Sequence, residues 1–314
     1  MKLFVLGAAT ELGLETVRQA AAAGHEVLGG CARGRRAEKV AAAGARPVEV
    51  GPLDAASLIS ALGPAEPDAV LNLEPGRANT LLHDGQLFKG QERWLQRSTA
   101  ALVAALARQR EPLLVHASAA LVYGDRLLAR EADPTEGAAL GGVAAAFEAA
   151  ERELLAGAAR VAVLRLGYLY GPQLADVAAY RRSFRRLRPY YAGPPGRAKP
   201  WLHVEDAARA LLLAAGCPEC AGRVSNVAGT DAPAFGTVID RFARRLGWPV
   251  RPPHLPRGAL RFLGGQITAE QVRLLDLSTS VDSSGFRAAT GWVPEFESVA
   301  AGMEQTVRAI GRHI

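Results

Sequence analysis

The segment from Phe4 to Gly13 constrains the fold of this chain more than any other. An apolar run ends at Gly7, a second glycine stands six residues later at Gly13, and a helical pattern of apolar residues follows. A strand, a glycine turn and a helix in this order let backbone N–H groups and a helix N-terminus approach a pyrophosphate. The middle glycine of a G-x-x-G-x-x-G pattern is replaced by Thr10, so the turn departs from the pattern at one position.

Length and composition narrow the class of protein. A chain of 314 residues can bury a large core in one big domain or in two unequal lobes. Only four of its 37 basic residues are lysines, and the heavy use of Ala, Gly and Arg resembles coding bias, so the net charge of +6 is weak support for a nucleic-acid partner. The N-terminus has no signal-peptide pattern and no stretch has the length of a membrane span, which favours a cytoplasmic protein.

Three cysteines, Cys31, Cys217 and Cys220, leave little room for a metal site. The last two form a Cys-Pro-Glu-Cys segment where a helical pattern gives way to a Pro/Gly turn. A metal site needs a second ligand pair at suitable spacing, and the sequence offers none. We therefore expect an incidental loop pair and no metal, although a redox or metal role remains open.

The first half of the chain alternates short apolar runs with helical patterns, which predicts a doubly wound α/β fold with a Rossmann-like parallel sheet. The expected strands are Lys2–Leu6, Glu26–Gly29, Arg46–Val50, Ala69–Leu73, Leu113–Ala117 and Val161–Leu166. The expected helices are Leu12–Ala23, Ala37–Ala43, Ala55–Ala61, Glu92–Gln109 and Val143–Leu155. Three of these helices are expected to stop at Gly24, Gly44 and Gly63.

After about Gly171 the pattern loosens and proline and glycine become frequent. This change predicts a smaller C-terminal lobe interleaved with the first part. We expect residues 1–171 to form the Rossmann-like core and residues 172–314 mainly the lobe, with segments at about 200–230 returning to the core.

Five further segments, in order along the chain, resemble the extended short-chain dehydrogenase/reductase family, in its NAD-dependent epimerase/dehydratase group. The segments are Ser118–Gly124, Leu164–Pro172, Trp201–Ala208, Asn226–Gly229 and Thr290–Pro294. The resemblance runs nearly end to end. It implies a Rossmann-like domain for NAD or NADP and a small substrate lobe.

The resemblance also assigns cofactor contacts at the first turn and beyond. They fall on Gly7, Thr10, Glu11, Leu12, Gly13 and Ser118. The expected second strand ends without a carboxylate that could accept a hydrogen bond from a ribose hydroxyl. Arg33 and Arg36 there would suit a 2′-phosphate, which favours NADP over NAD; a solvated arginine loop is the alternative. Pro52 and Glu74 also depart from the family pattern on the adenosine side.

Members of the family that oxidise or epimerise sugars use a tyrosine, a lysine four residues later, and a serine or threonine. The lysine ammonium lowers the tyrosine pKa, and spacing of four places both side chains on one helix face. No tyrosine of this chain has a lysine four residues later. Alignment through Glu151 places Val143 and Phe147 at the two helix positions and Ala119 at the Ser/Thr position, so all three groups are expected to be missing.

Substitutes for the missing groups are few. Tyr168 occupies a family position that usually faces the nicotinamide or the substrate, and it is the best surrogate acid or base. His116 and His203 could titrate near neutrality, and Glu74 could act as an acid if its pKa were raised. The alternative interpretations are that His203 has a structural role and that Glu74 is an ordinary exposed loop residue.

An arginine cluster lies in the expected lobe, at Arg181, Arg182, Arg185, Arg186 and Arg188, with Tyr190 and Tyr191 after it. It fits a substrate pyrophosphate, a nucleic acid, or simply a solvated helix face.

Three functions stay open. The chain is an NADP-binding relative without tyrosine–lysine chemistry, a working reductase or epimerase with a surrogate acid, or a scaffold without dinucleotide. A small-molecule ligand and a homodimer through Glu92–Gln109 and Val143–Leu155 fit the resemblance, whereas a membrane or nucleic-acid partner does not.

Overall fold

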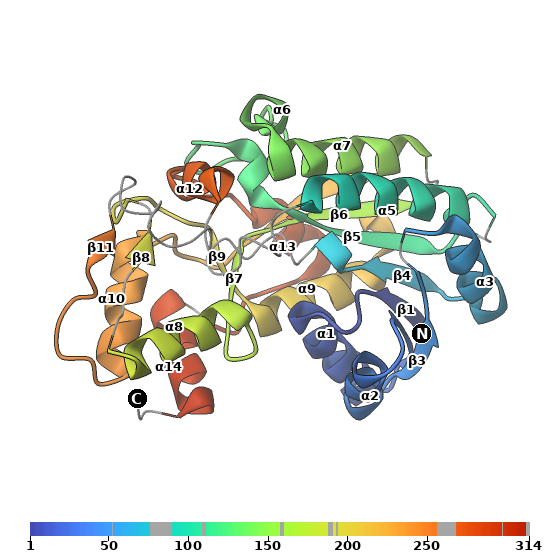
Figure 1. Cartoon of the computed structure of the whole chain (residues 1–314). Coiled ribbons are helices and arrows are strands. Elements are labelled where there is room, and N and C mark those ends of the chain that lie inside the picture. Colours follow the sequence, from blue (N-terminus) through green and yellow to red (C-terminus); the bar gives the residue numbers. More distant parts are fainter. Residues whose placement is uncertain are drawn as a thin grey trace.

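The computed structural model describes residues 1–51, 53–75, 90–108, 111–157, 160–187, 191–192, 194–255, 268–296 and 298–311 (Figure 1). The expectations that concerned Pro52, Arg188 and Tyr190 lie outside these residues. No helix of the described ranges combines the length and the apolar character that a membrane crossing needs.

One parallel sheet of seven strands forms the centre of the molecule, in the order β10-β6-β5-β4-β1-β2-β3. Its strands are β1 (Lys2–Leu6), β2 (Glu26–Cys31), β3 (Arg46–Glu49), β4 (Ala69–Asn72), β5 (Leu113–Ala119), β6 (Val161–Leu166) and β10 (Arg223–Val227). All neighbouring pairs of this sheet run parallel. The doubly wound Rossmann-like fold is thus confirmed, with its change of strand order between β1 and β4.

Helices cover both faces of this sheet (Figure 1). One face carries α1 (Glu11–Ala22), α2 (Arg35–Ala42) and α9 (Val204–Ala215), and the other carries α3 (Ala55–Ala65), α5 (Gln91–Leu106) and α7 (Gly142–Gly157). Alternate residues of each strand point to opposite sides of the sheet and enter two apolar clusters, the larger of which also includes the N-terminal part of α7 and much of the lobe. Helices α5 and α7 pack side by side, and a dimer through them stays a prediction.

Helix ends follow local chemistry at two of the three expected glycines. Gly24 and Gly44 have φ values of +79° and +103°, the left-handed region that glycine tolerates, directly after α1 and α2. The expectation for Gly63 is wrong, because α3 runs through Gly63 and Pro64 and ends at Glu66, whose φ is 41°. Packing explains the difference: apolar side chains on both sides of Gly63 are buried against the sheet and keep that turn helical.

The second part of the chain builds a lobe beside the carboxyl ends of the strands (Figure 1). It contains the paired strands β7 (Tyr168–Tyr170) and β9 (Trp201–His203), the paired strands β8 (Tyr191–Ala192) and β11 (His254–Leu255), and the helices α8 (Ala175–Arg185), α10 (Phe235–Arg245), α12 (Ala269–Leu275), α13 (Ser284–Thr290) and α14 (Val299–Ile310). The chain returns to the core between them, since α9 packs on α1 and β10 completes the sheet. The domain boundary itself stays a prediction.

Candidate functional site

The first turn lies at the change of strand order, where open α/β sheets bind their ligands. Gly7 has a φ of +75°, and a Cβ there would stand 2.8 Å from the backbone nitrogen of Glu74, just after β4. A Cβ on Gly13 would stand 2.0 Å from the carbonyl oxygen of Gly7. Both positions therefore require glycine for the close approach of turn, helix and neighbouring strand.

Thr10 closes this turn with its side chain. Its hydroxyl donates to the Gly7 carbonyl at 2.7 Å and accepts from the Gly13 N–H at 3.0 Å, so it is the N-cap of α1. Among the described residues, the N–H groups of Glu11 and Leu12 in the first helical turn have no hydrogen-bond acceptor. These two N–H groups are available to an anion, whereas the Gly13 N–H is bound to the Thr10 hydroxyl.

The end of β2 carries charge, as the sequence indicates. The Arg33 side chain forms an ion pair with Glu49 at the end of β3, and both side chains are exposed. Burial raises the pKa of the Cys31 thiol; the Arg36 charge lowers it and the Glu74 charge raises it further. A cation and a carboxylate thus both act on the end of β2, at the expected adenosine side.

The helix positions that align with tyrosine and lysine are filled by core residues. Val143 and Phe147 are 1% and 0% exposed and belong to the large apolar cluster. Ala119, at the expected Ser/Thr position, is also fully buried at the end of β5. The N–H of Val143 donates to a carboxylate oxygen of Glu270 on α12 at 2.6 Å.

Ser118 faces a buried ion pair rather than an open cleft. Its hydroxyl donates to Glu151 on α7, which accepts three further hydrogen bonds from Arg165 on β6 at 2.6, 3.0 and 3.1 Å. The guanidinium also donates to the Tyr123 hydroxyl, which donates in turn to the side-chain oxygen of Asn226 on β10. Residues of three family-like segments therefore join into one buried network that locks the sheet to α7. A cofactor contact of Ser118 stays a prediction.

Tyr168 lies in the cleft region, but its hydroxyl is engaged. It begins β7 and is 6% exposed, and its hydroxyl donates to a carboxylate oxygen of Asp176 in the first turn of α8 at 3.0 Å. The tyrosine ring meets the Trp201 ring edge-on at 4.9 Å between centroids. The surrogate proton donor of the sequence analysis thus points its proton at a carboxylate.

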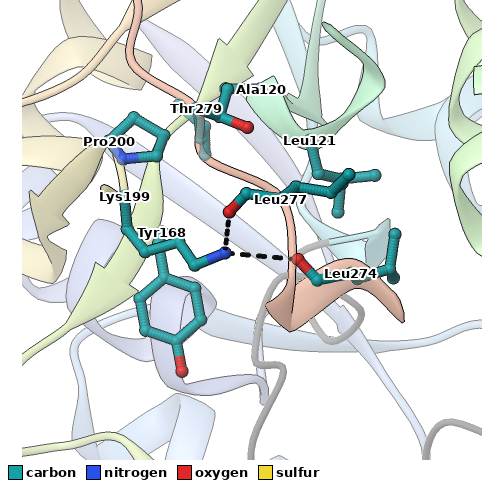
Figure 2. A pocket seen from close by; sticks show the side chains of 9 residues that line it. Ala120, Leu121, Tyr168, Lys199, Pro200, Leu274, Leu277 and Thr279 are labelled. Atoms are coloured by element: carbon teal, nitrogen blue, oxygen red, sulfur yellow. Dashed lines mark hydrogen bonds between the residues drawn. The ribbon is translucent and has the colours of Figure 1, made fainter. Parts of the chain in front are cut away.

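A lysine that the sequence analysis did not single out lies beside this tyrosine. Lys199 precedes β9, is 4% exposed, and lines a cavity with Tyr168, Leu166 at the end of β6, and Ala120 just after β5 (Figure 2). Its amine donates to the carbonyl oxygens of residues 274, 275 and 277, at 3.2, 3.0 and 2.6 Å. In Figure 2 the tyrosine hydroxyl points away from the amine.

Burial lowers the pKa of Lys199 to about 7, with Arg197 acting in the same direction and Asp125 against it. The sequence held one signal for this residue: it is the lone lysine between position 90 and the C-terminus of the chain. Its spacing to Tyr168 in the chain gave no hint, because β7 and β9 become neighbours only through their parallel pairing.

His116 and His203 both make contacts that are typical of a structural role. His116 is fully buried and its Nδ1 lies 3.1 Å from the Asn72 amide nitrogen; His203 is the N-cap of α9 and accepts from the Glu205 N–H. Burial lowers the pKa of each histidine to about 4, so both are neutral near pH 7. Within the described ranges no cluster of three or more His, Cys, Asp or Glu side chains is arranged for a metal ion.

The arginine cluster lies on α8 and just after it. Arg182, Arg185 and Arg186 are exposed and Arg181 is half-buried. A role of these arginines in ligand binding stays a prediction.

Comparison with known proteins places this geometry in a family. The sequence pattern of the NAD dependent epimerase/dehydratase family matches residues 3–228. No match was found among curated proteins. A dTDP-glucose 4,6-dehydratase from Bacillus anthracis, solved in complex with NAD, is 15% identical, with a TM-score of 0.79 over 98% of this chain and 96% of that one.

A second solved structure, a UDP-glucuronic acid 4-epimerase from Bacillus cereus with UDP-glucuronic acid and NAD, is 17% identical, with a TM-score of 0.78 over 99% of both chains. At these identities the likeness to solved structures shows the shared fold. The family pattern covers more than half of the sequence and includes the first turn, β4, β5, β6 and β10. The chain belongs to the NAD-dependent epimerase/dehydratase family.

Proposed function

We propose that this chain is an NADP(H)-binding member of the family that does not use a Tyr-x-x-x-Lys pair for proton transfer. The observation that carries the proposal is on α7, where Val143 and Phe147 stand at the two aligned positions, apolar and buried. An apolar side chain holds no proton to exchange with a substrate oxygen. Tyr168, the tyrosine that lines the cavity with Lys199, donates to Asp176, whereas a proton-transfer tyrosine needs a cation beside its oxygen.

The first turn supports binding of a dinucleotide. The steric demand at Gly7 and Gly13 keeps the backbone open to a pyrophosphate, and the N–H groups of Glu11 and Leu12 would hold it. A nicotinamide dinucleotide supplies hydride transfer when bound. Arg33 and Arg36 favour a 2′-phosphate over a bare ribose hydroxyl, since guanidinium groups pair well with phosphate.

The binding part of the proposal is tested by titration with NADPH and NADH, followed by melting temperature and fluorescence. We expect NADPH to bind at least tenfold more tightly than NADH. Substitution of Arg33 or Arg36 by alanine should remove the preference and leave NADH binding unchanged. Arg46→Ala is the matched control, because Arg46 begins β3 at the amino ends of the strands, whereas Arg33 follows the carboxyl end of β2. Equal affinity for both dinucleotides contradicts the NADP assignment, and no binding at millimolar concentration favours a partner subunit without dinucleotide.

The chemical part is tested by incubation with NADP⁺ or NADPH and with UDP-glucuronic acid, UDP-glucose or dTDP-glucose. Absorbance at 340 nm follows the cofactor and chromatography follows the sugar nucleotide. We expect no turnover with any of these substrates.

A second function has one observation in its favour. Tyr168 and Lys199 line the same cavity, and the lysine has a pKa of about 7, so a proton-carrying group stands near the ends of β5 and β6. In that case the chain is an active reductase or epimerase with a surrogate acid. Turnover that is lost in Tyr168→Phe supports this alternative; turnover that survives the change removes Tyr168 from it.

A further inference from the structure

The cavity beside Tyr168 is nearly filled by the protein itself. It has a volume of about 30 Å³, close to the share of one water molecule in the liquid. Leu274, Leu277 and Thr279 form one side, and Ala120, Leu121 and Leu166 at the ends of β5 and β6 form the other. Ligand pockets are usually about 300–1,000 Å³. The reacting end of a ligand therefore needs space that α12 and the turn after it now occupy.

We call residues Thr268–Leu277 the strap; it consists of α12 with its N-cap and the turn that follows. Lys199 fastens the C-terminal end of the strap, because its amine donates to the carbonyl oxygens of Leu274, Leu275 and Leu277. Figure 2 shows the bonds to Leu274 and Leu277. The last carbonyls of a helix have no donor within the helix, and a cation at that end is favoured by the helix dipole. One buried side chain thus supplies the donors that the end of α12 lacks.

Glu270 fastens the other end of the strap. Its carboxylate accepts the N–H of Val143 in the first turn of α7, which leaves the strap attached to the helix that carries the replaced positions. Gly142 makes this contact possible: a Cβ there would stand 2.0 Å from the Glu270 carboxylate oxygen. The carboxylate also meets the positive end of α7.

The residues just after the strap are anchored to fixed parts of the fold. The Ser278 hydroxyl accepts from the Ala198 N–H at 3.1 Å, and the Thr279 N–H donates to the Ala198 carbonyl at 3.0 Å. The Thr279 hydroxyl donates to the Gly124 carbonyl at 2.6 Å. These bonds join the strand before β9 to the turn after β5, so they hold the base of the strap independently of Lys199 and Glu270.

We propose that the strap is an autoinhibitory element: it closes the ligand cavity, Lys199 and Glu270 are its two fasteners, and Ser278–Thr279 is its hinge. A ligand reaches the ends of β5 and β6 only when the lysine releases the strap carbonyls. Burial lowers the pKa of the lysine to about 7, so loss of its proton near neutral pH removes the charge and one of the donors that hold the strap. The inference rests on the proposed function in one respect: both take the cavity beside Tyr168 and Lys199 to be a ligand site.

Backbone hydrogen exchange, measured peptide by peptide without any ligand, tests the strap directly. Lys199→Met keeps the aliphatic stem and removes the three donors, and Glu270→Ala removes the second fastener. In each variant we expect exchange of residues 269–277 to accelerate at least tenfold while exchange in α5 stays as in the wild type. Lys39→Met is the matched control, because Lys39 is an exposed lysine on α2. Unchanged exchange in the strap, or equal acceleration throughout the chain, overturns the proposal.

Ligand kinetics add a second test that can fail separately. With NADPH and UDP-glucuronic acid together as probes, the association rate should rise at least threefold in Lys199→Met and stay unchanged in Lys39→Met. An equal or lower rate in Lys199→Met counts against the strap. If neither probe binds to any of these proteins, the proposed function fails, and the exchange experiment alone decides whether the strap opens.

Discussion

At the scale of single residues, Thr10 shows how one hydroxyl changes a binding turn. The hydroxyl occupies the Gly13 N–H and the Gly7 carbonyl, two groups that a glycine at position 10 leaves to other partners. The threonine caps the helix and removes one donor from the pyrophosphate site that we propose at this turn. A binding turn and a helix cap thus compete for the same N–H group.

Thr10→Gly should therefore strengthen NADPH binding by roughly tenfold, the equivalent of about one hydrogen bond. The free energy of unfolding should fall by only a few tenths of a kcal/mol, since glycine is tolerated at an N-cap. Fluorescence titration and urea denaturation measure the two effects. Thr10→Ser, which keeps the hydroxyl, is the control and should change neither. Weaker binding in Thr10→Gly would mean that the hydroxyl contacts the ligand.

His203 predicts a specific acid sensitivity. Burial holds its pKa at about 4 in the folded state, below the ordinary 6.5, so between these values the unfolded chain binds a proton that the folded chain does not. The free energy of unfolding then falls as pH decreases from 6.5 to 4, by on the order of 3 kcal/mol. His203→Asn keeps a cap acceptor for the Glu205 N–H and should remove this part of the pH dependence. Chemical denaturation at pH 7 and 4.5 compares the two proteins; identical slopes with pH would contradict the assignment.

At the scale of elements, a buried ion pair joins a helix to the strand next to one edge of the sheet. Arg165 on β6 and Glu151 on α7 have side chains exposed by only 8% and 4%. The guanidinium also stacks over the Tyr123 ring at 4.8 Å. Because β6 lies between β5 and β10, this pair fixes the position of α7 against the sheet.

Substitution of one partner of the pair alone should lower the free energy of unfolding more than substitution of both partners together. Glu151→Leu leaves a buried guanidinium without its carboxylate and should lower the free energy of unfolding by about 3–5 kcal/mol. The double change Glu151→Leu with Arg165→Met should recover part of that loss, since two apolar side chains replace two charges. Urea denaturation of the two single variants and the double variant measures the coupling. A double variant as unstable as the sum of the singles would rule out the pair as a unit.

At the scale of the whole molecule, the strap links the lobe to the core, and Lys199 makes that link depend on pH. Burial lowers the pKa of Lys199 from the ordinary 10.5 to about 7; the charge of Arg197 lowers this pKa further, and the charge of Asp125 raises it. Tyr168 lines the same cavity as Lys199. Above pH 7 the unfolded chain holds a proton on this lysine that the folded chain has lost. The free energy of unfolding should therefore rise with pH.

Between pH 7 and 8.5 the rise should amount to about 1.4 kcal/mol per pH unit, and Lys199→Met should lack it. The window stops there because burial raises the thiol pKa values of Cys31 and Cys220, which act in the opposite direction at higher pH. Guanidinium denaturation at both pH values, with Lys39→Met as control, measures the difference. A wild type and a Lys199→Met variant with the same pH dependence would contradict the shift.

Much of the fold could be predicted from the sequence, because its signals are local. The bounds of β1 and β6 agree with the predicted ranges, and those of β2, β3, β4 and β5 differ from them only at their ends. Strand β10 and the short strands of the lobe were not predicted. Gly63 was misread because a glycine stops a helix only when its backbone turns left-handed, and packing against the sheet prevented that here. The turn at Gly7 and Gly13 was identified because its steric demand appears in the sequence as two glycines.

By itself the sequence determined the order of strands and helices in the first half of the chain, the glycine turn with its threonine, and the apolar character of Val143 and Phe147. These properties depend on residues close together in the chain, where spacing and side-chain type suffice. Only the tertiary structure decided where Lys199 and Glu270 lie and what their side chains hold. Lys199 and the carbonyls that it binds are some 75 positions apart in the sequence, so no local pattern records their contact.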